Sequence, residues 1–199
     1  MYQQVRLYIT RIFVGMLIIL LLVSGGKWET ESPMVSSVLF LAGCFLVGIA
    51  SLGRLWCSLY IAGYKTKHLV TVGPYSISRN PLYFFSMVGG VGVGLATETL
   101  TVAVVILLAF TFYYPFVIRF EENKLKALHG EEYKTYFQTV PQFWPKWSLL
   151  TEPAEYIVTP KTFRTHIFSA LWFIWMIGIL ELIEELRELN VLPTFFSIY

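Results

Sequence analysis

The chain alternates long apolar runs with short polar segments, as expected for a protein that crosses a membrane several times. Five apolar runs occupy residues 6–23, 34–53, 82–96, 99–118 and 163–180. A helix needs about 20 mostly apolar residues to cross the hydrocarbon layer. Only Thr97-Glu98-Thr99 interrupts the long stretch 82–118, which therefore predicts a hairpin of two antiparallel helices. The pattern predicts an all-α integral membrane protein with about five transmembrane helices.

The composition separates this chain from water-soluble proteins. Of its 199 residues, 56% are hydrophobic and only 14% are charged, whereas soluble domains carry about 25% charged residues. A formal net charge of +2 is too small a basic excess to argue for nucleic acid, which needs a clustered basic footprint. The first run is interpreted as a retained helix, because Ser24-Gly25-Gly26-Lys27-Trp28 lacks the small-x-small pattern of a signal-peptide cleavage site.

The positions of the basic residues predict the orientation of the chain, because loops rich in Lys and Arg stay in the cytoplasm. With a cytoplasmic N-terminus, 13 of the 15 Lys and Arg residues, Lys65 and Lys67 among them, fall on the cytoplasmic side. Only Lys27 and Arg187 fall outside. The segments 54–81 and 119–162 then hold most of the polar chemistry, and they are expected to carry an active site on the cytoplasmic face.

Metal chemistry has little support in the sequence. Cys44 and Cys57 form no zinc motif, and His68, His129 and His166 are scattered, so no metal site is expected. Four glutamates near the C-terminus follow the i, i+3, i+4, i+7 spacing of one helix face, which is most simply a solvated surface; a role in substrate gating or in a homodimer stays open. These residues are Glu181, Glu184, Glu185 and Glu188.

Two polar sites meet at the open end of the predicted hairpin. Asn80-Pro81 is typical of a helix start, where backbone N–H groups can bind an anion beside Arg79. Glu121 and Glu122 follow the end of the next run. The structural alternatives are a capped helix with an interfacial Arg and an i,i+4 pair of Glu122 with Lys126. A pocket with an anion site, carboxylates and aromatic rings suits a zwitterionic ligand such as S-adenosylmethionine.

Four blocks of residues carry a more specific signal within about residues 50–147. They read Lys67-His68-Leu69-Val70-Thr71-x-Gly73-x-Tyr75, Arg79-Asn80-Pro81-x-Tyr83, Glu121-Glu122, and His129-Gly130-Glu131-Glu132-Tyr133-x-x-Tyr136 with a closing Val140-Pro141. In this order and spacing they resemble the isoprenylcysteine carboxyl methyltransferase and phospholipid methyltransferase superfamily. The resemblance implies an integral-membrane enzyme that uses S-adenosylmethionine.

The resemblance also implies roles for individual residues. The role of the family's substrate-side arginine falls loosely on Arg119. Arg119 and Arg79 are the candidate catalytic residues, since either could orient a carboxylate or phosphate of the substrate with two hydrogen bonds. The family histidine of the second block is Asn80 here, and an amide cannot titrate near neutrality, so imidazole acid–base chemistry at this position is excluded. The first block opens with Lys67 where the family has histidine. The implied cofactor contacts are Leu69, Val70, Tyr75, Asn80, Pro81, Leu82, Tyr83 and Glu121, with Glu122 as a second contact.

The sequence is expected to form one domain over residues 1–199. Two spans in 1–53 precede a family-like core at 54–147, whose segments 54–81 and 119–147 build the cofactor pocket, and 148–199 adds one span. The glycines of 89–94 are interpreted as helix-packing positions rather than a nucleotide loop. The expected function is methyl transfer from S-adenosylmethionine to a lipophilic or membrane-associated acceptor, with membrane lipids as partners. A small transporter or a non-catalytic membrane scaffold is the alternative.

Overall fold

The computed structural model describes residues 2–64 and 68–199, and within the first helix it describes the side chains of Tyr8, Ile12 and residues 15–23. Lys65 and Lys67, which contribute to the predicted cytoplasmic charge, lie outside the described residues, as does the opening of the first family block at Lys67. The statements that follow concern the described part of the chain.

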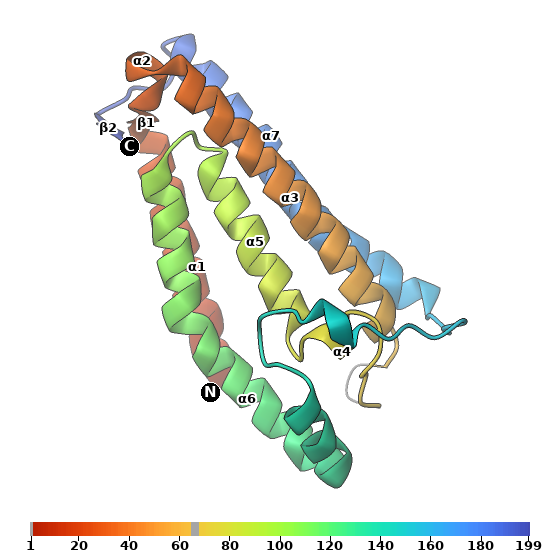
Figure 1. Cartoon of the computed structure of the whole chain (residues 1–199). Coiled ribbons are helices and arrows are strands. Elements are labelled where there is room, and N and C mark those ends of the chain that lie inside the picture. Colours follow the sequence, from red (N-terminus) through yellow and green to blue (C-terminus); the bar gives the residue numbers. More distant parts are fainter. Residues whose placement is uncertain (1, 65–67) are drawn as a thin grey trace.

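The described chain is built almost entirely of helices, which confirms the predicted all-α class (Figure 1). A single pair of three-residue strands accompanies them, and the elements run in the order α1 (Tyr2–Val23), β1 (Ser24–Gly26), α2 (Trp28–Glu31), α3 (Pro33–Ile61), α4 (Pro74–Ile77), α5 (Pro81–Leu95), α6 (Leu100–Thr139), a 3-10 turn η1 (Trp147–Leu149), α7 (Pro160–Glu188) and β2 (Phe196–Ile198).

Each of the five predicted spans lies on one helix, namely α1, α3, α5, α6 and α7. Among the described residues, α3, α6 and α7 are long and apolar enough to cross a membrane. Helix α5 is apolar but has only 15 residues, a rise of about 22 Å, which is shorter than the hydrocarbon layer of about 30 Å. Helix α5 turns through residues 96–99 into α6, as the predicted hairpin requires.

Two boundaries differ from the expectation. Helix α3 continues to Ile61, so the segment expected to begin as a loop at Arg54 is helical for two more turns. Helix α6 runs well past the end of its apolar part at Ile118 and changes direction at Gly130, whose φ of 52° and ψ of −119° are not helical. Glycine adopts this positive φ without the penalty that a Cβ atom brings. The chain beyond Gly130 therefore folds back toward the start of α5.

Helix α3 packs against both α5 and α7, and the three helices lie side by side (Figure 1). The contact between α3 and α5 is close because glycines meet there. A Cβ atom on Gly43 would lie 2.5 Å from the backbone nitrogen of Ala96 and 2.6 Å from the carbonyl oxygen of Gly92. Small residues let membrane helices approach in this way. The glycines of 89–94 thus serve helix packing, as expected.

The short parallel strands β1 and β2 join the end of α1 to the C-terminal segment at one end of the bundle (Figure 1). Ser24 pairs with Phe196, and Gly26 pairs with Ile198. The backbone N–H of Thr101 donates to the carbonyl of Tyr199 at 2.6 Å, which attaches the C-terminal segment to the start of α6. The hydrophobic pattern did not predict this pair of strands.

Replacing Gly43 by alanine should destabilise the helix bundle by about 1–3 kcal/mol, because the added methyl group has only backbone atoms to displace. The matched control is Gly48→Ala on the same helix, where a Cβ atom meets nothing within 4 Å. The thermal unfolding midpoints of both variants in detergent check this expectation. A Gly43 variant as stable as the Gly48 variant would contradict the close crossing.

Candidate active site

A cavity opens where α3 ends and α5 begins. Its walls come from the end of α3, residues 68–70, α4, the first turn of α5, the part of α6 around Glu121, and Tyr136 beyond the fold-back. The empty volume is about 970 Å³ including the open mouth. We call it the α5 cavity.

The α5 cavity collects most of the residues that the sequence suggested. Eight of the nine predicted cofactor contacts line it, and these are Leu69, Val70, Tyr75, Asn80, Pro81, Leu82, Tyr83 and Glu121. Sequence reasoning missed five further lining residues, namely Ile61, His68, Lys124, Leu125 and Tyr136. Helical periodicity could have found Lys124 and Leu125, since they lie three and four positions after Glu121 on the same helix face.

Glu122 lies behind the cavity wall in a buried ion pair with Arg79. The Arg79 Nε atom is 2.9 Å from Glu122 Oε1, and both side chains are more than nine-tenths buried. The same carboxylate accepts hydrogen bonds from the amides of Asn80 at 3.1 Å and Gln142 at 3.0 Å. A buried charge is tolerated when it is paired and hydrogen-bonded in this way. Glu122 therefore pairs with Arg79 rather than with Lys126, and it is not among the residues that line the α5 cavity.

Arg79 also holds the folded-back end of α6. Its Nη1 atom donates to the carbonyl oxygens of Phe137 at 2.8 Å and Val140 at 2.6 Å, and its backbone N–H donates to Pro141 at 2.9 Å. The guanidinium also stacks over the Phe137 ring at 4.1 Å from the centroid. These contacts hold Arg79 at the edge of the α5 cavity, and its expected catalytic role stays a prediction.

Asn80 precedes the first residue of α5, as predicted, but its side chain does not act as the predicted helix cap. The amide donates to Glu122 and, at 3.0 Å, to the carbonyl of Gln142. The backbone carbonyl of Asn80 accepts the first helical bonds, from Tyr83 and Phe84. The buried carboxylate is a strong charged acceptor that orients the amide of Asn80 toward itself, and the amide oxygen accepts no hydrogen bond from the first turn of α5.

Segment 140–151 passes behind the wall of the cavity and is attached to α4 and its flanks. The N–H of Lys146 donates to the carbonyl of Ile77 at 2.9 Å, and the N–H of Gly73 donates to Thr151 at 2.8 Å. The hydroxyl of Tyr136 donates to the carbonyl of Tyr75 at 2.7 Å. Burial raises the pKa of the Tyr75 phenol well above its ordinary value, so its hydroxyl stays protonated and can donate into the cavity.

A second cavity lies on the other side of the Arg79–Glu122 pair and shares only Arg79 with the α5 cavity. We call it the basic cavity, because Lys and Arg side chains dominate its charge. Arg119, for which the sequence suggested contact with the substrate, lines this cavity and not the α5 cavity. The other lining residues are Glu122, Asn123, Lys126, Tyr133, Lys134, Phe137 and Gln142.

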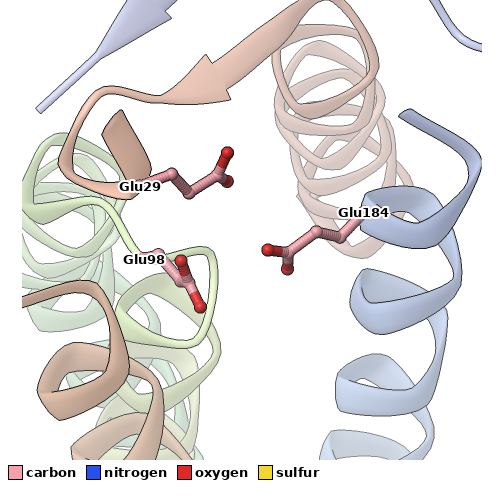
Figure 2. A group of neighbouring side chains, drawn as sticks. All are labelled: Glu29, Glu98 and Glu184. Atoms are coloured by element: carbon pink, nitrogen blue, oxygen red, sulfur yellow. The ribbon is translucent and has the colours of Figure 1, made fainter. Parts of the chain in front are cut away.

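An acidic cluster lies at the opposite end of the bundle (Figure 2). Glu29 of α2, Glu98 of the turn before α6 and Glu184 of α7 bring their carboxylate oxygens within 4.8 Å of one another. Burial, with the charge of Glu98 as a second cause, raises the pKa of Glu29. The sequence suggested no metal site and a solvated face for Glu184, yet this side chain is half-buried and faces the other two.

Comparison with known proteins identifies the family to which this chain belongs. The profile of the phospholipid methyltransferase family matches residues 32–132, and the chain belongs to this family, which confirms the resemblance seen in the four sequence blocks. It is 37% identical to the nickel-cobalt-cadmium resistance protein NccN of Alcaligenes xylosoxydans xylosoxydans, over 96% of this chain and 88% of that protein. It is 35% identical to the cobalt-zinc-cadmium resistance protein CzcN of Cupriavidus metallidurans, over 85% and 77% of the two chains. No solved structure matches the chain significantly.

Replacing Glu122 by glutamine should lower the free energy of unfolding by about 3–5 kcal/mol, because Arg79 would remain buried without a countercharge. The control is Glu132→Gln, an exposed carboxylate on the same helix, for which the change should stay within about 0.5 kcal/mol. Denaturation of the detergent-solubilised variants provides the measurement. Equal stability of the two variants would show that the pair is not a structural requirement.

Proposed function

We propose that this protein transfers a methyl group from S-adenosylmethionine to a lipophilic or membrane-associated acceptor. The observation that carries the proposal is the convergence of eight predicted cofactor contacts on one cavity, in a chain that belongs to the phospholipid methyltransferase family. The α5 cavity opens where the apolar helices end, so an acceptor with a long apolar part can reach it from the bilayer. We further propose that this end of the bundle faces the cytoplasm, since most basic residues lie there.

The chemistry of the lining residues fits the cofactor. The first turn of α5 and the Lys124 ammonium favour binding of the cofactor's carboxylate. The Glu121 side chain can accept hydrogen bonds from the cofactor's hydroxyl or amino groups. The rings of Tyr75 and Tyr83 suit a sulfonium and an adenine face. When bound, the cofactor supplies an electrophilic methyl group on sulfur.

The protein contributes binding, orientation and exclusion of water. Glu121 and Lys124 hold the polar groups of the cofactor at one side of the α5 cavity. Ile61, Leu82 and Leu125 form an apolar wall that favours a lipophilic acceptor. Holding both reactants in line lowers the entropic part of the barrier. Arg79 keeps segment 137–141 against the start of α5, which closes the cavity on that side. Asn80 is engaged by Glu122 and Gln142 and takes no part in proton transfer.

Replacing Glu121 by glutamine should weaken S-adenosylmethionine binding at least about tenfold, the equivalent of one charge-assisted hydrogen bond. The fold should be retained, because Glu121 lies on the cavity wall and outside the buried pair. Calorimetry on the detergent-solubilised protein measures the affinity, with Glu132→Gln as control. Unchanged affinity in the Glu121 variant would count against the cofactor site.

Activity itself is tested by incubating the purified protein with methyl-labelled S-adenosylmethionine and a membrane lipid extract, followed by identification of the labelled product. We expect label in a lipid or a membrane-associated small molecule, and much less label with the Glu121→Gln variant. Absence of any labelled product with the wild-type chain would favour the alternative of a transporter or scaffold.

The names of the two relatives suggest a physiological setting. Both are called resistance proteins, against nickel, cobalt and cadmium in one case and cobalt, zinc and cadmium in the other. We propose that this chain contributes to tolerance of such divalent cations and that the contribution depends on methyl transfer. The sequence identity extends across the α5 cavity and nearly the whole chain, which supports a shared role.

Cells that lack the gene should tolerate nickel, cobalt or cadmium less well, and wild-type protein should restore growth where Glu121→Gln does not. The comparison variant is Glu184→Gln, which alters the acidic cluster and leaves the α5 cavity intact. Minimal inhibitory concentrations provide the readout. Two outcomes would argue against dependence on methyl transfer. In one, the Glu121→Gln variant restores full metal tolerance; in the other, only the Glu184→Gln variant fails to restore it.

A further inference from the structure

The basic cavity is formed by the fold-back of α6 on itself. Arg119, Asn123 and Lys126 follow the i, i+4, i+7 spacing of one helix face before Gly130. Tyr133, Lys134 and Phe137 come from the helix after Gly130. The change of direction at Gly130 therefore places two short basic surfaces around one cavity, whose empty volume is about 990 Å³ including its mouth.

The charge of this cavity is positive. The carboxylate of Glu122 is already neutralised by Arg79. Lys134 forms an ion pair with the exposed Glu131 at 3.3 Å, and such exposed pairs contribute little. Arg119, Lys126 and Lys134 are all exposed and thus accessible to an anion.

The cavity also begins at the height where the apolar layer ends. Phe112, Phe116 and Phe120 form an exposed stripe at i, i+4, i+8 on α6, with exposed fractions of 69%, 64% and 41%. Such rings are favourable against lipid tails and costly in water. Arg119 lies within this last turn, so its guanidinium is at the level of the lipid headgroups.

We propose that the basic cavity binds the phosphate of an anionic membrane phospholipid. The inference goes beyond the proposed methyl transfer and does not depend on it, because the Arg79–Glu122 pair separates this cavity from the α5 cavity. The bound lipid is therefore an anchor for the folded-back helix and not the methyl acceptor. Arg119, Lys126 and Lys134 contact the phosphate.

The test is a lipid titration of the full-length, detergent-solubilised protein by native mass spectrometry, with dioleoylphosphatidylglycerol as the anionic probe and dioleoylphosphatidylcholine as the neutral one. We expect preferential binding of the anionic lipid. The double variant Arg119→Gln/Lys126→Gln should weaken that binding about 30-fold, since each basic group near an anionic lipid is worth roughly a factor of five.

The matched control is Lys146→Gln/Lys161→Gln, which removes two exposed basic residues outside the basic cavity and should leave binding within about twofold of wild type. The single variants Arg119→Gln and Lys126→Gln give the same answer if the double variant unfolds. Equal loss in the control pair, or equal binding of the two lipids, would overturn the proposal. Displacement of the lipid by millimolar inorganic phosphate would identify a site for free phosphate and would overturn it as well.

Discussion

The buried ion pair between Arg79 and Glu122 is the contact on which the functional end of this protein depends. It joins the segment that leads into α5, the middle of α6 and, through the carbonyl groups of Phe137 and Val140, the segment into which α6 folds back. Two charges taken out of water require each other and a full set of hydrogen bonds, and Asn80 and Gln142 complete that set. Because the pair lies between the α5 cavity and the basic cavity, a single network defines the wall of both.

The helix crossings determine where that network lies relative to the bilayer. Gly43 and Gly92 allow α3 and α5 to approach until backbone atoms touch, so the short α5 is held firmly although it is not long enough to span the layer alone. Its first turn is thereby fixed beside α6 at the level where the apolar part of α6 ends. Arg119 and Glu121 both follow the apolar part of α6, but Glu121 lines the α5 cavity and Arg119 lines the basic cavity. Both cavities therefore lie at the same end of the bundle.

The two ends of the bundle differ in chemistry. The end with both cavities carries cationic and aromatic side chains suited to anionic and zwitterionic ligands. The opposite end carries the three carboxylates of Glu29, Glu98 and Glu184 and the pair of strands that joins the end of α1 to the C-terminal segment. The match to the phospholipid methyltransferase family covers residues 32–132, which include most of the residues that line the α5 cavity. The resemblance to two metal-resistance proteins extends over nearly the whole chain.

The sequence by itself determined the helical class, the hairpin 82–118, the role of the glycines in packing and eight residues of the α5 cavity, because hydrophobic periodicity and short motifs are local properties of the chain. It could not decide which of the adjacent residues Glu121 and Glu122 faces the cavity, since both have the same side chain and the choice depends on the rotation of α6 against α5. The reversal at Gly130 and the acidic cluster were equally hidden. They depend on backbone torsion and on contacts between helices that are distant in sequence, and only the tertiary structure brings those residues together.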